Sequence, residues 1–395
     1  MKRFFSYIIL SFFLLLLPTG QASANNNDSI RLSLLTCAPG EEIYSLFGHT
    51  AIRYENSSQG IDIVFNYGLF SFNTPNFIFR FSLGETDYQL GATDYERFAA
   101  EYAFFGRSVW QQTLNLTDEE KTELIRLLQE NYRPENRVYR YNFFYDNCAT
   151  RPRDKIEESI AGKVIYPAEP QDGSLTFRDI VHQYCKGHPW ARFGIDLCIG
   201  SEADQPITQR QMMFAPFYLM DAFDGAQIKS DSIQRPLITA NELVVDATPE
   251  PDESGWMPTP LQCTLLLFIL TTAATIYGIR RRTGLWGIDL FLFGIAGIVG
   301  CVLAFLALFS QHPAVSSNFL LLVFHPGQLL FLPYIIYCVR KGKKCWYLTL
   351  NLAVLTLFIV LFPVIPQRFD FAVVPLALVL LIRSASNLIV TSKKK

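Results

Sequence analysis

The amino-acid sequence predicts an α+β domain outside the membrane, followed by an all-α bundle of five transmembrane helices. Residues from about 30 to 252 have the composition of a soluble domain, and that length can bury a sizeable core. After residue 260 the composition changes to long apolar runs, each long enough to cross a bilayer. We therefore expect a signal segment at 1–24, a soluble domain at 25–249, a linker at 250–260 and a membrane domain at 261–395.

The N-terminus has the form of a secretory signal. Lys2 and Arg3 precede the apolar run Phe4–Leu17, and the small residues Ala22-Ser23-Ala24 follow. This pattern predicts cleavage after Ala24 and export of the domain. The alternative is an uncleaved anchor, but the apolar core is short for a membrane span. Because the run contains no cysteine, the chain is not expected to be a lipoprotein itself.

Composition excludes several classes of function. The formal net charge of −2 and the lack of a basic patch give no support to nucleic-acid binding. No Gly-rich phosphate loop is present, and His182 and His188 lie six residues apart with no carboxylate or cysteine pattern that would suggest zinc. We expect neither a cofactor nor a metal.

Two short stretches predict a β-hairpin. The residues at 49–54 and 61–67 alternate in the way strands do, and the polar segment 55–60 between them predicts a turn. In a simple hairpin, His49 would lie opposite Asn66, and Arg53 opposite Asp62. Asn66 is then the better candidate to orient the His49 ring, whereas Asp62 is expected to pair with Arg53. A bulge in the turn would exchange these roles, so Asp62 remains an alternative.

Helices and an aromatic stretch follow the hairpin. Thr117 and Glu120 have capping-box spacing and start an amphipathic helix through Gln129. A second helix is expected from near Asn147 to near Gly162. The stretch from 70 to 98 is rich in aromatic residues, among them Phe70, Phe72, Phe77, Phe79, Phe81, Tyr88 and Phe98. Most of them are expected to build the core, and some are candidates to line an apolar groove.

Cys148 is the candidate nucleophile. It lies where the aromatic run 141–145 gives way to the second predicted helix. The positive end of a helix favours a thiolate and stabilises a neighbouring oxyanion, so this position predicts a reactive thiol. A thiolate of this kind needs a base, and His49, at the start of a predicted strand after Gly48, is the best candidate. A buried structural cysteine and a structural histidine remain the alternative interpretation.

Four cysteines lie in the predicted soluble domain: Cys37, Cys148, Cys185 and Cys198. Spare thiols tend to pair in an oxidising compartment. We expect a disulfide between Cys185 and Cys198, which bracket a short loop, and free thiols at Cys37 and Cys148. A bridge between Cys37 and Cys148 is the rival connectivity.

The predicted spans are Leu261–Ile279, Leu285–Phe309, Phe319–Val339, Trp346–Phe362 and Phe371–Val390. Basic clusters follow the first, third and fifth spans, so the positive-inside rule places these ends in the cytoplasm and the α+β domain in the periplasm. The loops on the periplasmic side carry His312 and Asn318, which are candidates to bind a lipid head group. Asp289 and Arg383 lie inside spans and are expected to face the bundle.

Four segments carry a resemblance to a known family: 34–40 (LLTCAPG), 47–53 (FGHTAIR), 65–68 (FNYG) and 146–151 (DNCATR). Together they resemble the Lnb family, the lipoprotein N-acyltransferases of Bacteroidetes. The order of histidine and cysteine is similar, more distantly, to circularly permuted NlpC/P60 papain-like proteins such as lecithin:retinol acyltransferase.

The resemblance implies an enzyme of the bacterial inner membrane with its catalytic domain in the periplasm. It implies a phospholipid as acyl donor, a cysteine thioester as intermediate and a diacylated lipoprotein as acceptor, with Asn147 and Arg151 beside the nucleophile as candidate substrate-binding residues. The alternatives are a membrane-tethered cysteine hydrolase acting on cell-wall peptides and a non-catalytic interaction module. Donor head group and oligomeric state stay open.

Overall fold

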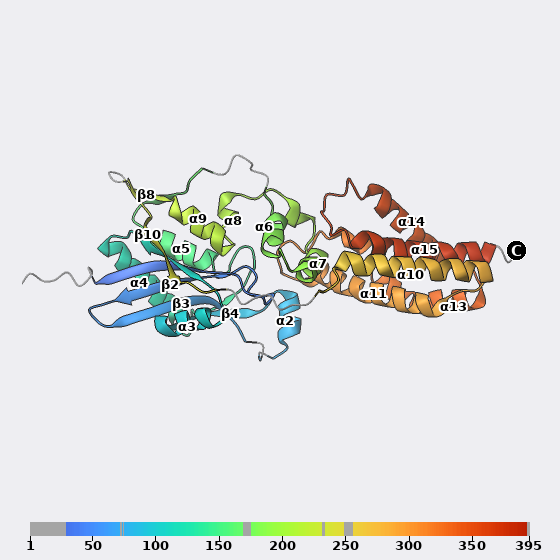
Figure 1. Ribbon diagram of the computed structural model, residues 1–395, viewed down its shortest axis with the longest axis horizontal. Coiled ribbons are helices and arrows are strands. Elements are labelled where there is room, and N and C mark those ends of the chain that lie inside the picture. The colour runs from blue at the N-terminus through green and yellow to red at the C-terminus, as the bar shows by residue number, and fades with distance from the viewer. Residues whose placement is uncertain are drawn as a thin grey trace, which may run out of the picture.

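The computed structural model describes residues 29–71, 73, 75–168, 175–230, 234–248 and 256–392. The predicted signal segment (1–24), residues 250–255 of the predicted linker, and residues 393–395 lie outside the described residues. The described chain forms an α+β domain joined end to end with a helical bundle, as Figure 1 shows.

A seven-stranded antiparallel sheet forms the centre of the α+β domain, with the strand order β10-β5-β1-β2-β3-β4-β6. Its strands are β1 (Ile30–Cys37), β2 (His49–Asn56), β3 (Ile61–Leu69), β4 (Asp87–Asp94), β5 (Val109–Leu114), β6 (Val138–Arg140) and β10 (Ile238–Val245). The predicted strands at 49–54 and 61–67 are present as β2 and β3. A second, three-stranded sheet contains β7 (Lys163–Ile165), β8 (Gln227–Lys229) and β9 (Gln234–Pro236).

Helices cover both faces of the large sheet. Helix α3 (Tyr95–Phe104) covers one face, and α4 (Asp118–Tyr132), α5 (Thr150–Ser159) and α9 (Pro216–Asp224) cover the other. The domain also contains α2 (Phe77–Leu83), α6 (Phe177–Tyr184), α7 (Pro189–Cys198) and α8 (Gln209–Met212). Because side chains alternate along a strand, Leu34 packs with α4, α5 and α9, whereas Leu35 packs with α3 on the opposite face. The predicted amphipathic helix is α4, and its capping box between Thr117 and Glu120 is formed.

The C-terminal region is helical and apolar. Its long helices are α10 (Pro260–Arg281), α11 (Trp286–Phe309), α14 (Trp346–Leu361) and α15 (Val373–Ser392); between α11 and α14 lie the 3-10 turn Phe319–Leu322 and the short helices α12 (Gly327–Leu330) and α13 (Leu332–Lys341). Among the described residues, four helices are long and apolar enough to cross a membrane, or five if the bent segment Phe319–Lys341 counts as one. As expected, Asp289 and Arg383 face the bundle interior, where they form an ion pair at 2.7 Å.

The third predicted span is not one continuous helix. The segment bends by 73° between Phe319–Leu330 and Leu332–Lys341. Pro326 precedes α12, and Pro333 lies in the first turn of α13. Since proline lacks a backbone N–H and clashes with the preceding turn, each proline starts a helix here and does not continue one.

The two basic clusters that the structure describes lie at the end of the bundle remote from the α+β domain (Figure 1). The ends of α13 and α15 meet there, because the Asn387 side chain accepts from Cys345 N and donates to Lys343 O. Gly284, which follows α10, lies so close to Val339 of α13 that an added Cβ would be 2.6 Å from the Val339 side chain. The end of α10 therefore lies beside the end of α13. This arrangement places the α+β domain on the side opposite the basic residues, in agreement with the predicted orientation.

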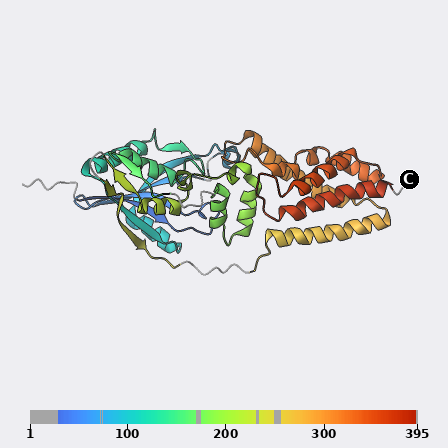
Figure 2. The ribbon, with the colours of Figure 1, turned by 90° about the horizontal axis from the view of Figure 1, so that it is seen from above.

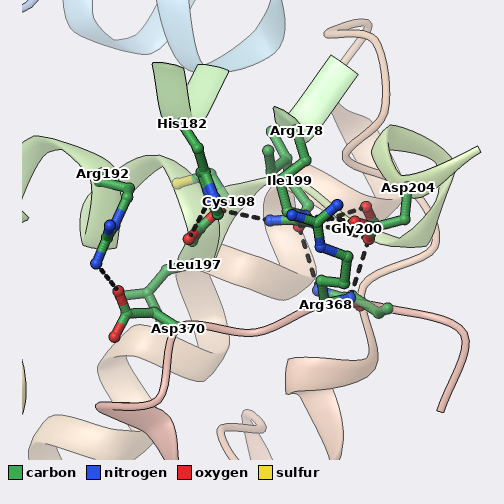
Figure 3. Close-up of polar contacts among 12 residues, drawn as sticks. Arg178, His182, Arg192, Leu197, Cys198, Ile199, Gly200, Asp204, Arg368 and Asp370 are labelled. Atoms are coloured by element: carbon green, nitrogen blue, oxygen red, sulfur yellow. Dashed lines mark hydrogen bonds and ion pairs between the residues drawn. The ribbon is translucent and has the colours of Figure 1, made fainter. Parts of the chain in front are cut away.

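The junction between the two parts contains buried charge. Arg178 of α6 is fully buried and pairs with Asp196 and Asp204 at 2.7 Å each (Figure 3). Arg368, from the loop before α15, pairs with Asp179 at 2.5 Å, and its backbone N–H donates to Asp204. Asp204 thus bonds to both parts of the molecule. In Figure 2 the helices around this junction lie between the sheet and the bundle.

Candidate active site

The candidate site lies where the sheet opens at the start of β2. The pairing of β2 with β3 ends at Ala51 and Asn66, so His49 and Thr50 have no strand partner on that side. Gly48 precedes them with φ +78°, and a Cβ there would lie 2.5 Å from the carbonyl oxygen of Cys37. The close approach of the chain before His49 to the end of β1 therefore requires glycine at position 48.

His49 and Asn66 are in contact, with 3.1 Å between Nε2 and Oδ1. The register behind this contact differs from the predicted one, because Ala51 and not His49 lies opposite Asn66. The shift is two residues, since the turn is tighter than expected, and a shift of two keeps every side chain on its expected face. His49 and Asn66 therefore meet as diagonal neighbours.

Asp62 is bonded to Arg53, at 2.8 and 2.6 Å through both carboxylate oxygens. Arg53 also donates to Gln111 at 2.7 Å, and its guanidinium lies 3.3 Å from the centre of the Tyr95 ring. In this structure, Asn66 contacts the His49 ring and Asp62 lies in the ion pair with Arg53.

Cys148 lies directly before α5, which begins at Thr150 and ends at Ser159, a shorter helix than predicted. Asn147 closes the turn, because its Oδ1 accepts from the backbone N–H groups of Ala149 and Thr150 at 2.8 and 2.9 Å. Its Nδ2 donates to the carbonyls of Phe143 and Phe214. Asn147 is buried and fully bonded within the protein, so it positions the Cys148 turn and is not available to a substrate.

The Cys148 sulfur reaches the open end of β2, where the backbone N–H of Thr50 bonds to it. This contact brings the sulfur next to the residue that follows His49. Nε2 of His49 faces the Asn66 oxygen, which accepts a hydrogen bond, so Nε2 carries the proton and Nδ1 is left as an acceptor.

Burial sets the resting charge of both groups. It raises the pKa of Cys148 to about 11, although backbone N–H groups of Thr50 and of Cys148 itself act in the opposite direction. Burial also lowers the pKa of His49 to about 4, and the hydrogen bond to Asn66 opposes this only in part. Both side chains keep partial contact with solvent. The backbone N–H groups at the helix start favour the thiolate, as expected, but desolvation outweighs them and leaves the thiol neutral at rest.

Tyr139 borders the same space, and sequence analysis missed it. A Cβ on Gly68 would lie 3.5 Å from Cβ of Cys148 and 3.9 Å from the Tyr139 hydroxyl. That hydroxyl is buried and has no hydrogen-bond partner among the residues that the structure describes. A buried donor without a partner is costly, and such groups occur where a ligand supplies the partner. No sequence pattern marks Tyr139, because β6 reaches the site only through the order of strands in the sheet.

Arg151 supports Tyr139. Its guanidinium lies 3.5 Å from the centre of the Tyr139 ring and pairs with Asp146 at 2.5 Å. A cation over the ring face makes the phenol a better hydrogen-bond donor. Arg151 therefore contacts the face of the Tyr139 ring and is held there by Asp146.

The predicted Cys185–Cys198 disulfide is not formed, and all eight described cysteines have free thiols. Cys185 ends α6 and packs into an apolar cluster with Leu46 and Phe47. Cys198 ends α7 at the junction, outside that cluster. The Cys37–Cys148 bridge is not formed either, and Cys37 is fully buried opposite His49 on β1. No group of three or more His, Cys, Asp or Glu in the described part of the chain could hold a metal ion.

The two membrane-loop candidates contact the α+β domain. Asn318 is buried, donates to Leu197 O at 2.7 Å and caps the turn that follows it, so it fixes the junction. The proposed site therefore does not include Asn318. His312 bonds through Nε2 to the Phe81 carbonyl of α2 at 2.6 Å. His182, which with His188 is one of the two other histidines of the α+β domain, bonds to Asp196 in the junction network of Figure 3 and is the alternative base to His49.

The fold and site define a membrane protein with a periplasmic α+β domain that holds a cysteine beside a histidine–asparagine pair. The family model of the Lnb N-terminal periplasmic domain matches residues 20–182, and that of the Lnb transmembrane domain matches residues 252–395. The chain therefore belongs to the Lnb family. No curated protein and no solved structure matches it.

Proposed function

We propose that this chain is a lipoprotein N-acyltransferase of the bacterial inner membrane. It would move an acyl chain from a phospholipid to the α-amino group of a diacylglyceryl-cysteine lipoprotein. The observation that carries the proposal is the Cys148 sulfur at the open end of β2, next to the His49–Asn66 pair, in a domain docked on a membrane bundle. Family membership agrees with this activity.

The first half-reaction forms a thioester. As the Cys148 sulfur attacks the ester carbonyl of the phospholipid, Nδ1 of His49 takes the thiol proton. The tetrahedral oxyanion accepts a hydrogen bond from the unpartnered Tyr139 hydroxyl. The C–O ester bond then breaks, and the lysophospholipid leaves with the proton from His49. Because both groups are neutral at rest, His49 acts as a general base on the thiol.

The second half-reaction forms the amide. The α-amino group of the lipoprotein cysteine attacks the thioester carbonyl, and His49 accepts a proton from the nitrogen. The C–S bond breaks, and the Cys148 sulfur regains a proton from His49. Asn66 keeps the ring in one tautomer and one orientation through both steps.

For the fold, we propose a circularly permuted papain-like arrangement of the NlpC/P60 type. The support is the histidine at the start of strand β2, the later cysteine directly before helix α5, and an amide that orients the histidine from the neighbouring strand β3.

The test uses the purified full-length protein in phosphatidylethanolamine vesicles. Mass spectrometry of Cys148 should detect an acyl adduct that hydroxylamine removes, and Cys148→Ser should lack it while remaining in the membrane. His49→Ala should slow adduct formation by roughly 10²- to 10⁴-fold. His188→Ala is the matched control, and His182→Ala tests the rival base.

Adding a diacylated lipopeptide should then discharge the acyl group to its amine. Discharge to water alone, or cleavage of a cell-wall peptide, would favour the hydrolase. An unlabelled Cys148 with retained acyl transfer would remove this cysteine from the mechanism.

A further inference from the structure

An open groove of about 880 Å³ lies between α2 and α11, beside the junction of the two parts. Its lining is mostly apolar and comes from Asn76, Phe77, Ile78, Phe79 and Ser82 on one side and Cys301, Val302, Phe305 and Leu306 on the other. One wall therefore belongs to the periplasmic domain and the other to a candidate membrane span.

Helix α2 exposes apolar side chains that a water-facing helix would not. None of its residues is buried, and Ile78 and Phe79 are 81% and 58% exposed. Clustered exposed apolar residues mark a binding surface or a membrane contact. An apolar helix beside the end of a span is suited to the boundary between head groups and acyl chains.

The loop after α11 holds α2 in place. Gln311 N donates to Leu83 O at 2.8 Å, and His312 bonds to Phe81 O at 2.6 Å. A Cβ on Gly84 would lie 2.9 Å from His312 N, so glycine is needed for this close approach. The groove is therefore a fixed feature between two docked elements.

The groove lies at the depth of lipid acyl chains in the periplasmic leaflet. At about 1.5 Å rise per residue, Leu306 and Cys301 lie roughly 4 and 12 Å from the end of α11 at Phe309. Val302, between them, is 51% exposed. A lipid in the outer half of the bilayer can thus reach the groove without leaving the membrane.

A line of aromatic rings leads from the groove to Cys148. Phe77 stacks on Phe70 at 5.8 Å, Phe70 contacts Tyr88 at 5.0 Å, and Tyr88 stacks on Tyr141 at 4.2 Å between ring centres. Phe70, Tyr88, Tyr141 and Cys148 belong to one hydrophobic cluster. The groove and the nucleophile are therefore joined by a continuous row of packed apolar side chains.

We propose that the α2–α11 groove is the binding site for the acyl chain of the phospholipid donor, which it guides from the periplasmic leaflet to Cys148. The proposal rests on the proposed function. The donor chain is the chosen occupant because only the chain that is to be transferred must bring its carbonyl to the sulfur. His312 then serves this site by holding α2, and not by binding a head group.

The test measures the rate of acyl-Cys148 formation in variants that fill the groove. Val302→Trp blocks it from α11 and Ser82→Trp blocks it from α2. Leu357→Trp is the control, because Leu357 on α14 is 56% exposed but lies outside the groove. Each variant is compared on long-chain phosphatidylethanolamine in vesicles and on dihexanoyl-phosphatidylethanolamine, whose chains are too short to need the groove.

Both groove variants should lose at least about tenfold on the long-chain donor, the loss expected when roughly two methylene groups no longer become buried. Their rate on the short-chain donor should stay within about twofold of wild type, which also shows that the site is folded. The proposal would be overturned if either groove variant, correctly folded, acylated Cys148 from the long-chain donor as fast as Leu357→Trp. A wild-type protein with no adduct on either donor would instead overturn the proposed function.

Discussion

At the scale of single residues, the charge state of Cys148 and His49 follows from their surroundings and not from their types. With pKa values of about 11 and about 4, the pair is neutral at physiological pH. In the proposed mechanism, the thiolate forms only as the thiol attacks, with His49 as base. A buried neutral thiol is also less open to oxidation than a resting thiolate would be, an advantage in the periplasm.

The pH dependence of Cys148 alkylation tests this charge state. Since its pKa is raised, the thiolate fraction should rise about tenfold per pH unit from about pH 7 to about pH 9. Labelling by iodoacetamide, followed by peptide mass spectrometry, should show that slope in wild type and in His49→Ala. Labelling that is already maximal near pH 7 would show a thiolate–imidazolium pair.

The roles of Asn66 and Asp62 separate cleanly in the structure. Asn66→Ala should lower the rate of acyl-Cys148 formation at least about tenfold, because the His49 ring loses the partner that fixes its tautomer. Asp62→Ala should change the rate little, since Arg53 keeps its hydrogen bond to Gln111 and its cation–π contact with the Tyr95 ring. Steady-state acylation of the two variants at matched protein level makes the comparison. A larger loss for Asp62→Ala would contradict the observed pairing.

The contact between His49 and Asn66 could be predicted from the sequence, because side-chain alternation in strands keeps a face even when the register slips by two residues. Asn147 is expected from the sequence as a substrate-binding residue, whereas in the structure it closes the turn before α5. Tyr139 and Thr50 could not be predicted. Their contacts with the site depend on how β6 and α5 pack against the opened strands, which no local pattern encodes.

At the scale of elements, an irregularity in β3 shapes the site. The β3–β4 register shifts between Asn66 and Leu69, and Gly68 has φ +90° there. Bulges near active sites redirect the chain. Here the bulge leaves room between Cys148 and Tyr139, at the position where the proposed oxyanion would form.

Gly68→Ala should destabilise the protein by about 1–2 kcal/mol through its positive φ and should also impair acylation, because the new methyl fills that room. Gly60→Ala is the matched control, since Gly60 has φ +65° but nothing within 4 Å of an added Cβ. Thermal unfolding and acyl-Cys148 formation are both measured. Equal acylation in the two variants would show that the space at Gly68 is not used.

The break in the third predicted span shows a feature that hydropathy alone does not predict. The run 319–339 is mostly apolar, so its mean hydropathy alone predicts one membrane-spanning helix. Pro326 and Pro333 divide it, and the backbone groups freed at the break are partly met by Gln328, which donates to Val323 O at 2.8 Å. The prolines were visible in the sequence, but the 73° bend depends on the neighbouring helices.

At the scale of the whole molecule, the two parts are joined by charged and polar contacts at one junction. Arg178→Ala would leave Asp196 and Asp204 buried without their cation, at a cost of roughly 3–5 kcal/mol. Arg368→Ala, at a half-exposed position, should cost less than about 1 kcal/mol. Thermal unfolding in detergent measures both. Similar losses for the two variants would show that the junction does not depend on the buried network.

The central claim is that Cys148 carries an acyl group to the N-terminus of lipoproteins. Mass spectrometry of lipoprotein N-termini from cells that depend on this chain for N-acylation tests it most directly. Wild type should yield triacylated N-termini, and Cys148→Ser, at matched membrane level, should yield only diacylated N-termini with a free amine. Triacylated lipoproteins at the wild-type level in the Cys148→Ser strain would contradict the account.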